Sequence, residues 1–370
     1  MYLKELVDIQ MGQSPDSKFY NNDKIGLPFY QGKADFGRIN PIPKIWCSKS
    51  KKEAKPNDIL ISVRAPVGDL NINNVQSCIG RGLAAITCKS DVDMMYLYYH
   101  LKYLKPQLRH ISTGSTFESI NRSQLENLII DYKPYFEQIK ISNILQVVQR
   151  QIEVREKLLR LYDLLIKSRF VEIFKNNKAR IAIGELFQVI DGDRGKNYPK
   201  ATDFFDEGYC LFLNAKNVTK NGFCFDTVQF ITQQKDEQLN KGRVLPEDII
   251  LTTRGTVGNV AYCDIKSSHK YMRINSGMVI LRSKDIIYDV DFITYVLSNQ
   301  INYGKEISGS AQPQLPISKL KDIMIPFPEI FLQKDFGYLI KQINKLKSDV
   351  QKSIDETQLL MDSLMQEYFG

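Results

Sequence analysis

Two long stretches of the chain carry apolar residues at alternating spacings of four and three. Residues 134–174 and 328–369 contain a single glycine, Gly337, and no proline after their first residue. Because glycine and proline interrupt helices, this pattern predicts two helices of about 40 residues. At a rise of ~1.5 Å per residue, each helix would be about 60 Å long.

The apolar positions of these helices form a narrow stripe with a period of about 3.5 residues, which is typical of a helix that packs against another helix. We expect the two helices of the chain to pair with each other, although a helix of another chain could also cover the stripe. The expected stripe positions are Ile141, Leu145, Val148, Ile152, Leu159, Ile166, Leu339, Ile343, Leu346, Val350, Met361 and Leu364.

Short β-branched runs, turn signals and one helical pattern make up the rest of each half. In the first half, the runs cover residues 59–63, 83–87 and 128–130, and the helical pattern covers 94–104. Strands of this length that alternate with turns and a helix indicate a mixed α+β domain.

A repeat runs through the whole chain. DILISVRAPVGDLNI at 58–72 recurs as DIILTTRGTVGNVAY at 248–262, and further stretches of the two halves match in the same order. Asp93 and Asp291 each precede a helical run, where a helix N-cap is expected. The repeat predicts an α+β fold with two pseudo-symmetric globular domains, each followed by a long helix. The expected boundaries are 1–133 and 179–327 for the globular domains, and 134–178 and 328–370 for the helices.

The composition is that of a folded protein with a mild excess of basic residues. The 370 residues suit about two domains. Lys and Arg number 50 against 42 Asp and Glu, and the net charge of +8 favours a polyanionic partner, although many proteins with other partners are as basic. No signal peptide and no run of ~18 apolar residues is present, so we expect a cytoplasmic protein. The six cysteines are never spaced as CxxC, and we expect reduced, buried thiols.

Motifs for catalysis are missing from the sequence. GDRGK at 192–196 lacks the spacing of a Walker loop, and no [DN]PP[YF] motif of a DNA methyltransferase occurs. Asp58 and Asp248 precede strands as nuclease acids do, but no ExK follows, so these acids are expected to close turns. Three histidines offer neither a catalytic triad nor a metal site. We therefore expect no catalytic residues and no metal ligands, and interpret the chain as a binding protein.

Several motifs resemble those of specificity subunits of type I restriction-modification systems. GSTFESINRSQLENLII from Gly114 and GSAQPQLPISKLKDIMIPFP from Gly309 resemble the family's junction between recognition domain and helix. LPFYQGKAD and DILISVRAPVG fit the same family, and the resemblance covers essentially the whole chain. One departure is that FESINRSQL lacks the proline-rich character of QPQLPISKL in the second copy.

The resemblance implies two target recognition domains, each reading one half of a bipartite, asymmetric sequence in double-stranded DNA. It implies that the long helices pair as an antiparallel coiled coil and fix the spacing between the halves. It also implies docking of two modification subunits, which use S-adenosylmethionine, and of restriction subunits, which use ATP and magnesium, while this prokaryotic chain binds no cofactor itself. An assembly scaffold without its own sequence readout and a single-chain nuclease remain as alternatives.

Residues that the two halves share are expected to contact phosphates, to hold hairpin geometry or to serve docking, because the two domains should read different half-sites. Lys33 with Lys216, and Arg64 with Arg254, form this shared class. For the arginines, an ion pair with the aspartate before the adjacent strand is the alternative. Base readers are expected where the halves differ but keep polar side chains of sufficient reach. These candidates are Gln31, Arg38 and Arg81 in the first half, and Asn214, Asn217 and Arg273 in the second.

Overall fold

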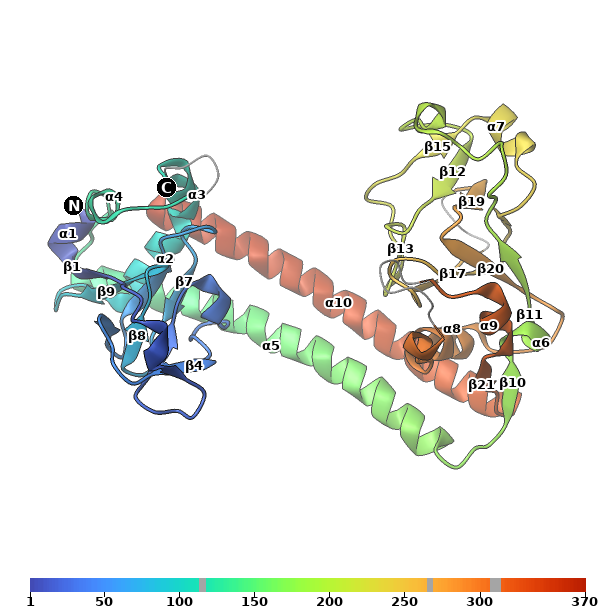
Figure 1. The fold of residues 1–370 in the computed structure, drawn as a ribbon, viewed down its shortest axis with the longest axis horizontal. Coiled ribbons are helices and arrows are strands. Elements are labelled where there is room, and N and C mark those ends of the chain that lie inside the picture. The colour runs from blue at the N-terminus through green and yellow to red at the C-terminus, as the bar shows by residue number, and fades with distance from the viewer. Residues whose placement is uncertain (113–117, 265–268, 307–313) are drawn as a thin grey trace. The chain divides into compact units, whose positions relative to one another are not determined.

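A computed structural model describes residues 1–112, 118–264, 269–306 and 314–370. Contacts divide the chain into two compact units, which can be followed in Figure 1. Unit 1 consists of Met1–Leu158 and Val350–Gly370, and unit 2 consists of Leu159–Asp349. The repeated segments that begin at Gly114 and Gly309 lie partly outside the described residues.

The same four-stranded antiparallel sheet forms the centre of each unit. Its strand order is β1-β9-β6-β7 in unit 1 and β11-β20-β17-β18 in unit 2. The strands of unit 1 are β1 (Val7–Met11), β9 (Leu83–Cys88), β6 (Ile59–Ser62) and β7 (Leu70–Ile72). Those of unit 2 are β11 (Phe187–Asp191), β20 (Met278–Ser283), β17 (Ile249–Thr252) and β18 (Val260–Tyr262). Equivalent segments of the two halves take equivalent places, which confirms the repeat.

A second sheet in each unit contains one parallel pair, β3 with β8 in unit 1 and β12 with β19 in unit 2. In unit 1 its strands are, in order, β2 (Tyr20–Asn21), β4 (Ile45–Cys47), β3 (Leu27–Tyr30), β8 (Ser77–Ile79) and β5 (Glu53–Ala54). In unit 2 they are β15 (Phe230–Ile231), β12 (Cys210–Leu213), β19 (Met272–Ile274) and β16 (Arg243–Val244).

Two short ladders complete the strands of unit 2. They are β10 (Arg180–Ala182) with β21 (Met324–Pro326), and β13 (Val218–Thr219) with β14 (Gly222–Phe223). In unit 1, the predicted strand at 128–130 forms only an isolated bridge between Tyr2 and Ile129. That strand prediction was wrong, because the run pairs with Tyr2 alone and forms no ladder.

The shorter helices lie in both units. They are α1 (Leu3–Leu6), α2 (Met94–Tyr103), α3 (Lys105–His110) and α4 (Arg122–Glu126) in unit 1, and α6 (Ile183–Leu186), α7 (Gln233–Gln238), α8 (Val290–Asn299) and α9 (Ile317–Asp322) in unit 2. Single 3-10 turns occur at Ser17–Phe19, Lys33–Asp35, Ala201–Asp203 and Tyr303–Lys305. The mixed content confirms the predicted α+β class.

The central strands β6 and β17 are buried on both faces. Ile59 and Ile61 of β6 belong to the core under α2, whereas Leu60 between them belongs to the core shared with the second sheet. The residues of β17 divide in the same way. Because side chains alternate across a strand, one short apolar run fills two cores at once.

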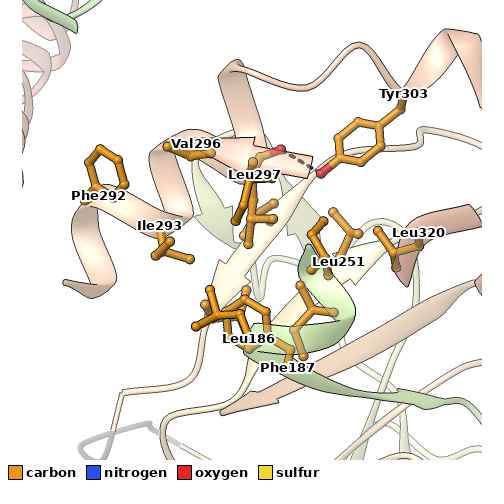
Figure 2. Close-up of a cluster of buried hydrophobic side chains, with 14 of the residues drawn as sticks. Leu186, Phe187, Leu251, Phe292, Ile293, Val296, Leu297, Tyr303 and Leu320 are labelled. Carbon is orange, nitrogen blue, oxygen red and sulfur yellow. Dashed lines mark hydrogen bonds between the residues drawn. The ribbon is translucent and has the colours of Figure 1, made fainter. Parts of the chain in front are cut away.

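The core under α8 in unit 2 is drawn in Figure 2. In Figure 2, Ile293 and Leu297 of α8 point toward Leu251 and Leu186, whereas Phe292 and Val296 lie on the other side of α8; all four belong to the same core. The hydroxyl of Tyr303 donates to the carbonyl oxygen of Leu297 at 2.8 Å, so this buried polar group is satisfied where α8 ends.

The N-caps of α2 and α8 are aspartates. The Asp93 carboxylate accepts a hydrogen bond from the N–H of Tyr96 at 2.8 Å, which confirms its predicted role. In unit 2 the cap is Asp289, whose carboxylate accepts from the N–H of Phe292 at 2.9 Å. The prediction of Asp291 as a cap was wrong, because α8 begins at Val290 and Asp291 already lies in its first turn.

The two long helices are α5 (Tyr135–Phe174) and α10 (Ile330–Phe369), each of 40 residues as predicted. In unit 1, Ile141 and Leu145 of α5 share a core with Met361 and Phe369 of α10. In unit 2, the end of α5 shares a core with the beginning of α10. The helices therefore pair antiparallel in each unit, and in both units they also pack against the globular part.

The predicted stripe is largely covered. Six of its positions are buried, namely Ile141, Leu145, Ile152, Ile166, Ile343 and Met361, and five are half-buried, namely Val148, Leu159, Leu339, Val350 and Leu364. Leu346 is exposed, so its assignment to the stripe was wrong. Its neighbour Lys347 pairs with Asp163 of α5 at 2.6 Å, and a helix turns about 100° per residue, which directs Leu346 away from α5.

The six cysteines are free thiols. Cys47, Cys78, Cys210 and Cys263 are buried, and Cys88 and Cys224 are half-buried. Burial raises the pKa of the Cys210 thiol to about 12, so it stays protonated at neutral pH. Among the described residues, no helix is long and apolar enough to cross a membrane.

Candidate nucleic-acid interface

The loops RAPVG and RGTVG have the same hydrogen-bonded frame. The Ser62 hydroxyl donates to Pro66 O at 2.7 Å and accepts from the N–H of Asp69 at 2.9 Å. The Thr252 hydroxyl donates to Thr256 O at 2.5 Å and accepts from the N–H of Asn259 at 3.0 Å. A hydroxyl at the end of the central strand therefore closes the loop that begins with an arginine in each unit.

The aspartates before these strands do not pair with the loop arginines. The carboxylate of Asp58 accepts from the N–H of Lys55 at 2.6 Å and from the Thr87 hydroxyl at 2.7 Å. The carboxylate of Asp248 forms an ion pair with Arg282 at 2.8 Å. The alternative of an ion pair between these acids and Arg64 or Arg254 is therefore wrong, because other groups occupy both carboxylates.

Three loops of unit 1 meet beyond the end of β6. The backbone N–H that precedes Arg64 donates to Gly82 O at 2.9 Å, and the N–H of Gly82 donates to Gln31 O at 3.2 Å. These bonds bring together Gln31, Arg64 and Arg81, whose side chains are exposed. We call these three residues, with Ser14, the loop junction of unit 1.

The same arrangement occurs in unit 2. The N–H groups of Thr253 and Arg254 both donate to Gly277 O, at 2.8 Å and 3.1 Å. The N–H of Asn275 donates to the carbonyl that precedes Asn214 at 3.0 Å. We call Asn214, Arg254, Ser276 and Arg194 the loop junction of unit 2.

A glycine is required beside each junction. A Cβ atom on Gly12 would lie 2.2 Å from the carbonyl oxygen of Gly80, and one on Gly192 would lie 2.1 Å from that of Asn275. No side chain fits against a backbone oxygen at that distance, which explains why the repeat keeps both glycines.

The two junctions differ in which loop supplies an arginine. In unit 1, Arg81 lies on the loop, and its N–H donates to the Ser14 hydroxyl at 3.2 Å. In unit 2, the residue at the place of Ser14 is Arg194, whose Nη2 donates to the carbonyl oxygen of Ser276, the counterpart of Arg81, at 3.3 Å. Arginine and serine have thus changed places across the same backbone frame.

The Arg194 guanidinium forms an ion pair with Asp191 at 3.1 Å, and the loop that carries it is held by Asp193. The Asp193 carboxylate accepts from the N–H of Gly195 at 2.8 Å and from that of Asn240 at 2.8 Å. Burial opposes ionisation, but these backbone hydrogen bonds and one from Lys241 hold the pKa of Asp193 below its usual value. The sequence prediction missed Arg194. The available signal was its place two residues after Gly192, as Ser14 follows Gly12.

The two shared lysines lie in different surroundings. Lys33 forms an ion pair with Asp69 at 3.0 Å, and Lys105 binds the same carboxylate at 2.5 Å. Burial opposes ionisation of Asp69, but the hydrogen bonds from Lys105 and Lys33 hold its pKa below the usual value. Lys216 is exposed and follows Asn214, whose side-chain oxygen accepts from its N–H at 2.9 Å.

Arg38 is exposed but engaged by α5. Its guanidinium lies 2.9 Å from Glu156 and 3.5 Å from Glu153. It therefore does not belong to the loop junction of unit 1, and the structure brings together only Gln31, Arg64 and Arg81 of the predicted contacts in that unit.

Two predicted base readers are structural residues. Asn217 is buried, and its amide donates to the carbonyl oxygens of Cys224 at 3.0 Å and Thr227 at 2.8 Å. Arg273 is also buried, pairs with Asp236 and donates to the carbonyl oxygen of Lys241 at 2.6 Å. Side chains buried and bonded in this way cannot reach a base, so both predictions were wrong.

Comparison with known proteins identifies the family. The model described as type I restriction modification DNA specificity domain matches residues 1–160 and 176–357. The type I restriction enzyme MjaIX specificity subunit of Methanocaldococcus jannaschii is 27% identical over 331 residues, which cover 83% of this chain and 75% of the relative. The putative type I restriction enzyme MjaX specificity subunit of the same organism is 45% identical over 150 residues, which cover 40% of this chain and 35% of that relative.

A solved structure shares the fold along the whole chain. The S subunit of a type I restriction-modification system from Mycoplasma genitalium is 18% identical, with 100% of this chain and 95% of that chain covered and a TM-score of 0.59. With both repeats inside the family match, the chain belongs to the type I restriction-modification DNA specificity family.

Proposed function

We propose that this chain recognises a bipartite DNA sequence for a type I restriction-modification complex, with one half-site read by each repeat. The proposal rests on family membership and on the paired loop junctions, which keep one backbone frame and exchange the side chains within it. A shared frame suits a shared task such as phosphate contact, and divergent polar side chains suit different bases.

Within each junction we assign roles by this rule. Arg64 and Arg254 contact phosphates, because both repeats keep them beside the same loop. Gln31 and Arg81 read bases in one half-site, and Asn214 and Arg194 read bases in the other. Arginine pairs well with guanine, and amide side chains pair well with adenine.

The chain is proposed to act without catalytic residues of its own. Two modification subunits that use S-adenosylmethionine, and restriction subunits that use ATP and magnesium, supply the chemistry. Their docking surface is proposed to lie on the long helices, which expose several large apolar residues. These include Val154, Leu161 and Leu164 on α5, and Tyr338, Leu359 and Leu360 on α10.

Exchange of residues 179–327 for the second recognition domain of another family member tests the bipartite readout. The complex of the chimera with its modification subunits is expected to methylate a motif in which one half is new and the other is unchanged, because each repeat builds its own junction. Methylome sequencing of cells that carry the chimera measures both halves. A motif that changes in both halves, or in neither, would contradict the proposal.

The alternatives make different predictions. A scaffold without sequence readout predicts no sequence-dependent DNA binding by the chain, even with the modification subunits present. A single-chain nuclease predicts magnesium-dependent cleavage of DNA by the purified chain alone. Binding and cleavage assays on the same preparation separate these outcomes from the proposed function.

Replacement of single junction arginines should act on one half-site each. Arg81→Ala is expected to relax specificity at one position of one half-site and to weaken binding by about 1–3 kcal/mol. Arg194→Ala is the matched variant and should have the same effect in the other half-site only. Competition binding with duplexes mutated in either half measures this. Equal loss of discrimination in both half-sites would remove these residues from base readout.

A further inference from the structure

Each long helix carries a buried glutamine at its fourth position. Gln138 of α5 is 0% exposed and Gln333 of α10 is 1% exposed, although glutamine is mostly found at protein surfaces. Both lie in the first turn of their helix and bond to the globular part of their own unit. Because both repeats bury a glutamine at the same position, we expect the two side chains to bind equivalent partners.

That partner is the N-cap residue of the short helix. In unit 1, Gln138 Oε1 accepts from the N–H of Asp93 at 2.9 Å, and its Nε2 donates to Lys133 O at 2.8 Å and to Asp91 O at 3.2 Å. In unit 2, Gln333 Oε1 accepts from the N–H of Asp289 at 3.1 Å, and its Nε2 donates to the carbonyl oxygen of Pro328 at 2.8 Å. Each amide thus satisfies one donor of the globular part and one acceptor just before its own helix, and Gln138 also satisfies a second acceptor in the globular part.

Each N-cap aspartate is hydrogen-bonded to two helices. Their carboxylates hold the first turn of α2 or α8, and their N–H groups are held by α5 or α10. Because hydrogen bonds require a narrow range of distance and angle, this contact fixes the direction in which the short helix leaves the long one. The apolar contacts around it are less directional.

The next turn of α10 leaves room for the cap. Four residues after the glutamines stand Ser142, which is buried, and Gly337. A Cβ atom on Gly337 would lie 2.0 Å from Oδ1 of Asp289. This explains why one glycine is tolerated inside a helix of 40 residues, where it costs about 1 kcal/mol relative to alanine.

We propose that Gln138 and Gln333 are positioning residues that set how strictly the spacing between the two half-sites is read. This inference rests on the proposed bipartite readout. One base pair of spacer shifts a half-site by ~3.4 Å along the duplex and by about a tenth of a turn around it. A recognition domain held rigidly on its long helix rejects such a shift, whereas a domain that turns on that helix accommodates it.

The test uses the full chain in complex with its modification subunits. Initial rates of methylation are measured on duplexes that carry the native motif with its native spacer, or with one base pair added or removed. For Gln138→Leu and for Gln333→Leu, the rate on altered spacers relative to the native spacer is expected to rise about tenfold. That factor corresponds to ~1.4 kcal/mol, the size of one or two lost hydrogen bonds.

A second variant disturbs the same contact between the long helix and the N-cap aspartate without changing a glutamine. Gly337→Ala places a methyl group against the Asp289 carboxylate and is expected to relax the spacer in the same direction. The matched controls are Gln151→Leu on α5 and Gln351→Leu on α10, which are exposed glutamines of the same helices. They should keep the wild-type ratio.

The readout separates positioning from simple loss of stability. A destabilised chain loses methylation on all spacers together and leaves their ratio unchanged. Hydrogen exchange of the Asp93 and Asp289 amides, measured on the folded complex, should quicken in the glutamine variants. If all three variants keep the wild-type ratio of rates on altered and native spacers, the inference is overturned. The proposed function is still upheld in that case, provided that the wild-type complex methylates a motif with two halves. A wild-type motif without two halves would overturn both.

Discussion

Asp236→Ala is expected to lower the stability of unit 2 by about 3–5 kcal/mol, the loss typical when one partner of a buried ion pair is removed. The Asp236 carboxylate is 0% exposed and pairs with both Arg243 and Arg273, and Arg273 is only 4% exposed. Removal of the carboxylate would leave a buried guanidinium without its counter-charge, although three backbone carbonyl contacts to it remain.

Chemical unfolding of the full chain, followed by amide hydrogen exchange in β16 and β19, measures this loss where the arginines lie. Glu237→Ala is the control, because that residue neighbours Asp236 in α7 but is exposed. It should change stability by less than about 0.5 kcal/mol. Similar effects of the two substitutions would show that the buried pair contributes little.

Phe336→Ala is expected to cost about 3–5 kcal/mol, as large-to-small changes of buried aromatic residues do. Its ring is 0% exposed and lies between α5 and α8, with centroid distances of 5.4 Å to Phe170 and 6.2 Å to Phe292. The substitution would leave a cavity where both long helices meet α8. The expected result is loss of order in that region of unit 2 before the rest.

Hydrogen exchange along α8 and the beginning of α10 measures that local loss. Phe331→Ala on the same helix is the control, since Phe331 is 64% exposed and its removal creates no cavity. Phe336→Leu should fall between the two, because most of the buried volume is kept. A uniform loss of protection across unit 2 would contradict the local role.

The long helices were the most predictable elements, because a periodic apolar stripe is a local signal that no tertiary contact has to complete. The repeat likewise gave the equivalence of the two central sheets. The strand order was not accessible, since the pairing of β1 with β9 depends on contacts between residues far apart in the sequence. The cap of α8 was misplaced because Asp289 and Asp291 both suit the position and backbone geometry decides between them.

The site residues were predictable where the two halves of the sequence could be compared. They were not predictable where burial of a side chain decides whether it can contact DNA. Gln31, Arg64 and Arg81 lie together as exposed residues. Arg273 has the same side chain as a base reader, but its neighbours Met272 and Ile274 are buried on a short strand, and Asp236 is 37 residues away. A polar residue inside an apolar strand was the available warning. Its partner could not be identified before the fold placed α7 beside β19.

Unit 1 cannot complete its core until unit 2 has been translated. Residues 350–370, which bring Met361, Met365 and Phe369 to Tyr96, follow the whole of unit 2 in the chain. At ~5–20 residues per second, synthesis of unit 2 leaves the Tyr96 surface of the nascent chain uncovered for roughly 10–40 seconds. The arrival of the end of α10 is the step that covers this surface and completes the core of the first unit.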